Sequence, residues 1–251
     1  MATTETGHNI NVANLNKLNQ VIITFETVYN PAKTRITLEA LEKLYTQGNS
    51  QIGFVQSAKN SYSIKVDQRE QAFATVKSFS TRIIGALAGT NVTKQLIKDA
   101  KSINAKIQAK RIDNPNTPQT NTQEPTENLN NDPISSQHSI SRQSHISLEE
   151  NFSDLVDLLE TTTGYDPNEN EFKIAELKTF ADNLKTANQN IDTAVANVAD
   201  KRIDRNIFLY NTDLGLVNTA LEAKEYIKGL YGATSPQFKL VNKISFKNIN
   251  K

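Results

Sequence analysis

Apolar residues recur every three or four positions over most of this 251-residue chain, and that period constrains the fold more than any other feature. Such spacing places apolar side chains along one side of an α-helix, whereas the apolar–polar alternation of β-strands is almost absent. We therefore predict an all-α fold built from antiparallel helical bundles. The clearest stripe consists of Leu177, Phe180, Leu184, Ala187, Ile191, Ala194 and Val198.

A second apolar stripe follows the first but is out of phase with it across Ala199–Arg202. One straight helix would bury the two stripes on different faces. We therefore predict a hairpin or a sharp kink at Ala199–Arg202, although neither Gly nor Pro marks it. The second stripe consists of Ile203, Ile207, Tyr210, Leu214, Val217 and Leu221.

The segment from Asp113 to Ile146 differs in composition from the rest of the chain. Of its 34 residues, 23 are Asn, Thr, Ser, Gln or Pro, and none is aromatic. Such a segment cannot bury enough apolar surface to offset the entropy lost on ordering. We predict a disordered linker at 113–146. The alternative, a partner-binding or modified segment around Ser135–Ser147, stays open.

Helix start and stop signals divide the second part of the chain. The capping box Ser147-Leu-Glu-Glu150 predicts a helix of about 16 residues that ends near Gly164. Gly229 and Gly232 are expected to end the last long helix. Ser235-Pro236 is expected to cap a short final helix, with Pro at its first position.

The first part of the chain shows a similar order. After a helix expected near Asn14–Val28, Tyr29-Asn30-Pro31 is the counterpart of Tyr165-Asp166-Pro167 at a spacing of 136 residues. We predict two related modules, 12–112 and 147–251, behind a flexible tail at 1–11. Each module is expected to contain a short helix, a Tyr-[Asn/Asp]-Pro turn, two long helices and a terminal helix. At the same spacing, Ile36 matches Phe172, Leu41 matches Leu177, Leu44 matches Phe180, Val55 matches Ile191, Ala58 matches Ala194 and Arg69 matches Arg205.

Composition and charge argue against several classes of partner. The formal net charge is +1, so there is no global attraction to nucleic acid or to anionic membranes. The absence of cysteine excludes disulfides and thiolate nucleophiles. No apolar run approaches membrane-spanning length, and the polar first residues do not resemble a signal peptide. We expect a cytoplasmic protein without nucleic-acid or membrane partners.

The histidines offer little for catalysis or metal binding. His8, His138 and His145 all fall in the predicted tail or linker, so we expect no histidine on a helix. A metal or nucleophile site in a helical bundle would need such a histidine. No glycine-rich phosphate-binding loop occurs either. We expect no metal, cofactor or small-molecule ligand.

One charged cluster stands out, Asp200-Lys-Arg-Ile-Asp204-Arg205, with a relative at Lys65–Arg69. It could form an interaction surface or anion site that is built twice. The alternative is a solvated helix start, in which Asp200 caps the first turn and Asp204 pairs with a nearby arginine for about 0–1 kcal/mol. The candidate interaction residues are Arg69, Arg202, Asp204 and Arg205.

Three stretches near the C-terminus, Arg202–Tyr210, Leu214–Val217 and Tyr226–Lys239, carry a resemblance. They are similar to the C-terminal region of uncharacterised helical proteins of Bacteroidota. The resemblance covers about 40 residues, implies a helical module that ends near Lys251, and implies no activity, cofactor or site residue.

These observations favour a non-enzymatic structural or protein-interaction protein, an assembly subunit or adaptor that binds a protein partner or itself. Two modules on a tether suit bivalent binding. The alternatives are a membrane-active, pore-forming-like helical protein, for which Ile83–Gly89 is the only candidate segment, and an enzyme that uses carboxylates and lysines. For the enzyme, the candidate carboxylates are Glu39, Glu42, Glu176 and Asp182.

Overall fold

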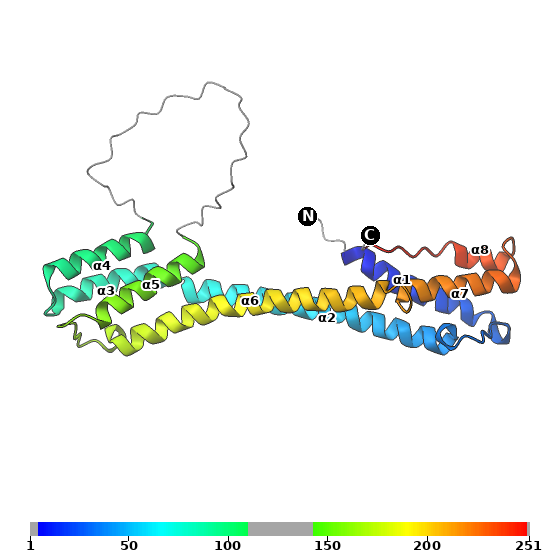
Figure 1. The fold of residues 1–251 in the computed structure, drawn as a ribbon, viewed down its shortest axis with the longest axis horizontal. Helices are drawn as coiled ribbons and strands as arrows, with labels where there is room; N and C mark the ends of the chain where they lie inside the picture. Colours follow the sequence, from blue (N-terminus) through cyan, green and yellow to red (C-terminus); the bar gives the residue numbers. More distant parts are fainter. Residues whose placement is uncertain (1–4, 110–142, 250–251) are drawn as a thin grey trace, which may run out of the picture. The chain divides into compact units, whose positions relative to one another are not determined.

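The computed structural model describes residues 5–109 and 143–249, and its regular secondary structure there is entirely helical (Figure 1). The predicted all-α class is therefore confirmed. Nearly all of the predicted linker, 113–146, lies outside the described residues. The α-helices are α1 (Glu5–Ile23), α2 (Leu38–Phe73), α3 (Val76–Ala86), α4 (Lys94–Ile107), α5 (His145–Glu160), α6 (Ile174–Tyr210), α7 (Leu216–Tyr231) and α8 (Pro236–Asn242), with short 3-10 helices η1 (Glu26–Val28), η2 (Thr34–Ile36), η3 (Leu87–Gly89) and η4 (Asn170–Phe172).

The chain forms two compact units, and each combines residues from both halves of the sequence. Unit 1 comprises Met1–Ile64 and Asp192–Lys251, and unit 2 comprises Lys65–Ile191. We call residues 5–109 the N-terminal half and residues 143–249 the C-terminal half. The modules predicted at 12–112 and 147–251 therefore do not coincide with the compact units.

The lengths of α2 and α6 explain this difference. With 36 residues, α2 is about 54 Å long, whereas the 19-residue α1 has about half that length. Leu41 near the start of α2 joins the core of unit 1, and Phe73 at its end joins the core of unit 2. In α6, likewise, Leu184 belongs to the core of unit 2 and Leu209 to that of unit 1.

In unit 1, α1 of the N-terminal half packs against α7 and α8 of the C-terminal half (Figure 1). The turn segment 29–37, which precedes α2, also contacts α7. Contacts between distant parts of the sequence thus hold this unit together. Its fully buried side chains include Leu15, Leu18, Ile22, Leu41, Leu209, Leu216, Ala220, Ala223, Ile227 and Val241.

In unit 2, α5 of the C-terminal half packs against α3 and α4 of the N-terminal half (Figure 1). Phe152 on α5 is fully buried, with ring centroids 6.0 Å from Phe79 and 5.0 Å from Phe180. Gly164 lies after α5 with φ of +93° and accepts a hydrogen bond of 3.2 Å from the amide of Asn91. An added Cβ at Gly164 would lie 2.6 Å from the carbonyl oxygen of Asn91, so a glycine is required there.

A tyrosine closes the turn segment before each long helix. The hydroxyl of Tyr29 donates to the carbonyl of Ile36 at 2.6 Å, and the hydroxyl of Tyr165 donates to the carbonyl of Phe172 at 2.6 Å. Burial raises the pKa of both phenols, that of Tyr165 to about 12. Each ring fills the core while its hydroxyl satisfies a buried carbonyl, which fixes the direction in which the long helix starts.

The predicted hairpin at Ala199–Arg202 is wrong, because α6 continues through these residues to Tyr210. The first stripe is buried or half-buried as expected, but Ile203 and Ile207 of the second stripe are 58% and 59% exposed. The hairpin was predicted on the assumption that both stripes are buried. Because Ile203 and Ile207 are exposed, one continuous helix can carry both stripes. The chain turns instead at 211–215, where Asn211 Oδ1 accepts hydrogen bonds of 2.9 Å from the amides at 213 and 214.

Several predicted boundaries also move. Helix α1 begins at Glu5, so the tail predicted at 1–11 is helical from that residue onward. Helix α5 is capped by Ser144, whose Oγ accepts from the amide of Ser147 at 3.1 Å, rather than by Ser147. Gly229 lies inside α7, and Gly232 ends it, while Ser235 caps α8 as predicted. Each predicted pair of long helices is one long helix followed by a shorter one, α3 or α7.

Candidate interaction surface on α6

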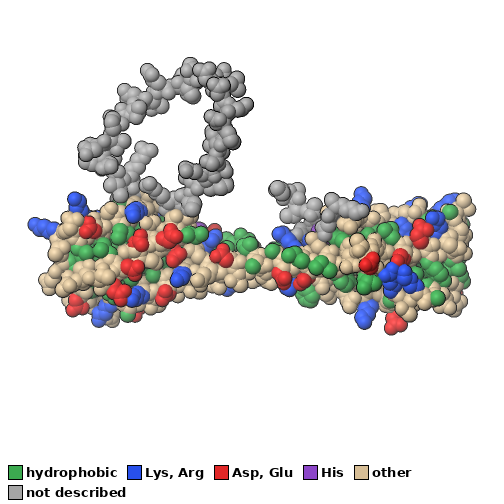
Figure 2. All heavy atoms as spheres, viewed as in Figure 1, with side chains coloured by type: hydrophobic (Ala, Val, Ile, Leu, Met, Phe, Trp, Pro, Cys, Tyr) green, Lys and Arg blue, Asp and Glu red, His purple; other side chains and the backbone are tan. Residues whose placement is uncertain are grey.

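An apolar stripe on α6 faces solvent in unit 1. Val195, Ile203 and Ile207 are 50%, 58% and 59% exposed, and Ala199 between them is exposed as well. The four residues follow one another at a spacing of four, so the stripe winds slowly around one side of the helix. We call these four residues the α6 stripe. Hydrophobic side chains on the visible face of α6 are green in Figure 2.

Two hollows flank the α6 stripe, and both belong to unit 1. A cavity of about 470 Å³ lies between α2 and α6, and its walls include Tyr62, Val195, Val198 and Ala199. A second cavity of about 440 Å³ lies at the other end, where Ile203, Ile207 and Tyr210 contribute to its wall. The stripe therefore belongs to a grooved apolar surface, and contiguous exposed surfaces of this kind commonly mark binding sites.

The two edges of the α6 stripe carry opposite charges. Lys59 and Arg202 line the cavity between α2 and α6 on one edge. Asp200 and Asp204 lie on the other edge with 61% and 49% of their side chains exposed. Lys201 pairs with both aspartates at 2.8 and 3.2 Å, which leaves that edge with a net negative charge.

A buried polar cluster holds the end of α6 in place. His8 Nδ1 lies 2.8 Å from the hydroxyl of Tyr210, and Asn11 Nδ2 donates to the same hydroxyl at 3.1 Å. Asn11 also donates to the carbonyl of Lys247 at 2.8 Å, and its Oδ1 accepts from the Lys247 amide at 3.0 Å. Burial raises the pKa of Tyr210, although the bond from Asn11 and the charge of Arg205 oppose this.

The four residues predicted from the charged cluster are divided between the two units. Arg202 and Asp204 lie at the edges of the α6 stripe, and Asp204 pairs with Lys201 at 3.2 Å. Arg205 is 3% exposed and donates to Asn206 Oδ1 from Nε at 3.0 Å, so it is a buried residue of α6. Arg69 belongs to unit 2. Partner binding by these residues stays a prediction.

The position of Ile203 and Ile207 also differs from the expectation. The helical spacing of these two residues predicted a place in a core, and the structure leaves both at the surface of α6. They form the apolar part of the same surface that carries Arg202 and Asp204 at its edges. The charged cluster alone therefore marked only the borders of the candidate site.

Histidines do lie on helices, contrary to expectation, since His8 is in α1 and His145 begins α5. His145 packs edge-on against Phe73 with centroids 4.8 Å apart. Desolvation lowers the pKa of His145, the charge of Arg69 lowers it further, and Glu70 opposes this. The folded protein therefore favours the neutral imidazole at this position.

This lowered pKa predicts a loss of stability in mild acid. The pKa of His145 is lower in the folded than in the unfolded chain, so its contribution is complete above the unfolded pKa and is lost as pH falls through the folded value. Urea unfolding of the wild type and of His145→Gln between pH 8 and pH 5 checks this. The wild type should lose more stability on acidification than the variant. If the free energy of unfolding changed equally with pH in both proteins, His145 would not have a lowered pKa in the folded chain.

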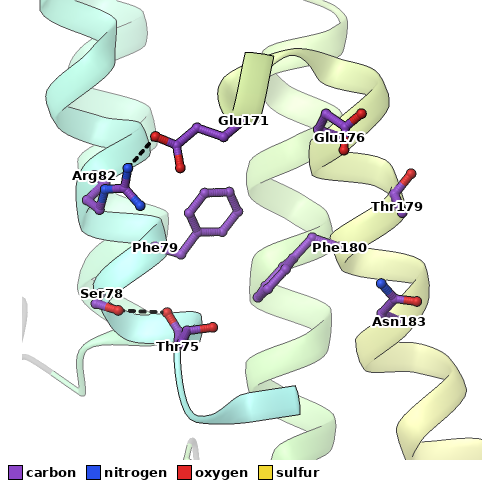
Figure 3. A pocket seen from close by; sticks show the side chains of 9 residues that line it. All are labelled: Thr75, Ser78, Phe79, Arg82, Glu171, Glu176, Thr179, Phe180 and Asn183. Carbon is purple, nitrogen blue, oxygen red and sulfur yellow. Dashed lines mark hydrogen bonds and ion pairs between the residues drawn. The ribbon is translucent and has the colours of Figure 1, made fainter. Parts of the chain in front are cut away.

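A separate cavity of about 400 Å³ lies in unit 2 between α3 and α6 (Figure 3). The rings of Phe79 and Phe180 point into it, and Arg82 pairs with Glu171 at its rim. Glu176, one of the carboxylates considered for catalysis, lines the same cavity but is exposed to solvent. The other carboxylates considered for catalysis, Glu39, Glu42 and Asp182, are exposed on their helices.

Within residues 5–109 and 143–249, no three His, Asp or Glu side chains lie close enough together to hold a metal ion. Over the same ranges, no helix combines the length and the apolar character needed to cross a membrane. No protein-family model, curated protein or solved structure matches the chain.

Proposed function

We propose that the chain is a non-enzymatic protein-interaction protein of the adaptor or assembly kind, and that it binds an amphipathic α-helix of a partner protein along the α6 stripe. The exposed side chains of Val195, Ile203 and Ile207 carry this proposal. Full burial of a side chain of this size is worth about 1.5–3 kcal/mol. A helix laid into an apolar groove is a common mode of recognition in which residues at helical spacing act as anchors.

The charged edges of the α6 stripe indicate the chemistry of the partner helix. A complementary helix would carry acidic residues opposite Lys59 and Arg202 and basic residues opposite Asp200 and Asp204. Opposite potentials across an interface favour the correct partner and the correct register. We therefore expect the partner helix to present an apolar seam between one acidic edge and one basic edge.

Antiparallel pairing with a second copy of this chain fits the α6 stripe less well. Two antiparallel helices packed face to face bring equivalent edges together. An antiparallel pair of α6 stripes would therefore set Asp200 and Asp204 of one copy against the same residues of the other. Juxtaposed like charges disfavour that pairing. Against antiparallel self-pairing, the charges favour a different protein as the occupant.

The proposal includes two related modules, one in each half of the chain. The equivalent hydrogen bonds of Tyr29 and Tyr165 support this relation. At the spacing of 136, the apolar pairs matched in the sequence are buried together or half-buried together. At a spacing of 140, the residues of α3 and η3 that are 0% exposed correspond to residues of α7 that are also 0% exposed: Val76 to Leu216, Ser80 to Ala220, Ile83 to Ala223 and Leu87 to Ile227.

A displayed library of helical peptides, selected on the purified full chain, tests the proposed binding mode. The variant Ile203→Asp/Ile207→Asp removes the apolar anchors. Leu240→Asp, on α8 and 55% exposed, is the matched control that adds a charge to another exposed apolar position. Enriched peptides should be amphipathic with one acidic and one basic edge. Their affinity should fall at least tenfold for the stripe variant and stay unchanged for the control.

Three results would contradict the proposal. Selected peptides that bind the stripe variant as well as the wild type would place recognition elsewhere. Light scattering could show that the wild type is a dimer and that the Ile203→Asp/Ile207→Asp variant is a monomer. The occupant of the stripe would then be a second copy of the chain. Stripe-dependent binding to phosphatidylcholine–phosphatidylserine vesicles, without any peptide binding, would make the stripe a membrane contact.

A further inference from the structure

In unit 1, a basic turn segment of the N-terminal half binds an acidic residue of the C-terminal half. Arg35 donates to Glu222 on α7 from Nε at 2.8 Å and also from Nη2. The ammonium of Lys33 lies 3.0 Å from the same carboxylate. Arg35 also donates from Nη1 to the carbonyl of Asp213 at 2.6 Å. This cluster joins the turn segment 29–37 to α7.

In unit 2, the charges on the two sides of the corresponding contact are reversed. Arg82 on α3 of the N-terminal half pairs with Glu171 in the turn segment 165–173 of the C-terminal half (Figure 3). The guanidinium of Arg82 also lies 5.3 Å from the ring centroid of Phe172. Glu169 lines a cavity of about 600 Å³ together with Arg82. Here the turn segment is acidic and the helix supplies the cation.

The charges are reversed position by position between the halves. At the spacing of 136, Lys33 corresponds to Glu169 and Arg35 to Glu171. At the spacing of 140, Arg82 corresponds to Glu222, in the register set by the buried residues of α3 and α7. At these three positions the N-terminal half is uniformly cationic and the C-terminal half is uniformly anionic.

We propose that this charge reversal specifies which half each turn segment binds. Each turn segment accepts the α3 or α7 helix of the other half and rejects the equivalent helix of its own half. If α2 broke into a hairpin and the N-terminal half folded on itself, Arg82 would lie against Lys33 and Arg35. In the C-terminal half, Glu222 would likewise lie against two glutamates. Specificity of this kind depends on repulsion in the wrong pairing as much as on attraction in the right one.

The pattern of buried positions does not by itself make this choice. The buried residues of α3 and α7 occupy equivalent positions, and both helices present small or aliphatic side chains at 0% exposure, such as Ile83 and Ala223. The turn segments are also alike, with one tyrosine hydrogen bond in each. The reversed charges distinguish one half from the other. This proposal concerns pairing inside the chain and does not depend on which partner binds the α6 stripe.

Two full-chain variants with the net charge of the wild type test the proposal. Arg82→Glu/Glu222→Arg gives each helix the charge that suits its own half and mismatches both observed contacts. The second variant adds Lys33→Glu, Arg35→Glu, Glu169→Lys and Glu171→Arg, which reverses every charge and restores both contacts. We expect the first variant to melt about 5 °C below the wild type and the second to return to within about 2 °C of it.

Thermal unfolding followed by circular dichroism gives these melting temperatures, at low and at high salt. The deficit of the first variant should shrink at high salt, because screening weakens repulsion between partly exposed charges. A first variant that melts with the wild type would overturn the proposal. So would a second variant that melts as low as the first, because the loss would then come from the substituted side chains and not from their pairing.

Discussion

Phe152→Ala is expected to lower the free energy of unfolding by about 3–5 kcal/mol, the largest single effect foreseen for this protein. Phe152 is 0% exposed and packs against Phe79 of the other half and against Phe180 of its own. Truncation removes the transfer free energy of the ring and leaves a cavity among residues from both halves. Unfolding in guanidinium chloride measures this loss of stability as a lower denaturation midpoint.

Phe54→Ala is the matched control, because Phe54 lies on α2 with 53% of its surface exposed. We expect this variant to lose less than about 1 kcal/mol. A double-mutant cycle compares Phe79→Ala/Phe152→Ala with the two single variants. It should give a coupling free energy of about 0.5–1.5 kcal/mol between these two rings, which lie on α3 and α5. Equal losses for Phe152→Ala and Phe54→Ala would mean that Phe152 is not in a core.

Asn19→Val is expected to raise the free energy of unfolding by about 1–3 kcal/mol. Asn19 on α1 is 1% exposed, and neither its Oδ1 nor its Nδ2 has a hydrogen-bond partner among the described residues. A buried amide that exchanges water for no partner loses its hydration without compensation. At a spacing of 137 the corresponding residue of α5 is Val156, which is 2% exposed.

The reciprocal substitution Val156→Asn makes the control, since it places an amide at the corresponding apolar position of unit 2. It should destabilise the chain by about 2–4 kcal/mol. Urea unfolding of both variants, with equal m-values, measures the two effects. If Asn19→Val lowered the stability instead, the amide of Asn19 would have to take part in a hydrogen bond that valine removes.

Local features of the fold were predictable from the sequence because local physics determines them. The helical period identified the part of α6 before Ala199, and the Tyr-[Asn/Asp]-Pro segments identified both turns before the long helices. Ser235 caps α8 as its sequence indicates, with an Oγ that accepts from the amide of Phe238 at 3.1 Å. Ser144 and Ser147 show the limit of this approach. Both can cap a helix, and in the structure the earlier of the two, Ser144, does so.

Long-range pairing was not predictable in the same way. A pattern of apolar residues shows which face of a helix is buried but not which helix covers it. The equivalence of α3 and α7 makes pairing within a half and pairing between halves look alike at the level of apolar residues. The charges at Arg82 and Glu222 distinguish the two pairings, but their meaning depends on contacts with Lys33, Arg35 and Glu171 that only the structure reveals.

The candidate site was missed for a related reason. Ile203 and Ile207 read as core residues because apolar side chains at helical spacing usually are. The structure leaves them exposed beside charged residues of the predicted cluster, so the apolar residues and the charges belong to one surface. The phase difference between the two apolar stripes was the useful signal. On one continuous helix, a second apolar stripe out of phase with the buried one indicates a second face with a different role.

Zero-length carbodiimide cross-linking of Lys33 to Glu222 tests most directly whether each compact unit joins the two halves of the chain. Their charged groups lie 3.0 Å apart, and Lys178 and Glu160, 2.6 Å apart within the C-terminal half, provide the internal control. In a mixture of unlabelled and isotope-labelled protein, we predict both cross-links in the monomer, each between peptides of the same label. Recovery of the Lys178–Glu160 link without the Lys33–Glu222 link would contradict the joining of the two halves in unit 1.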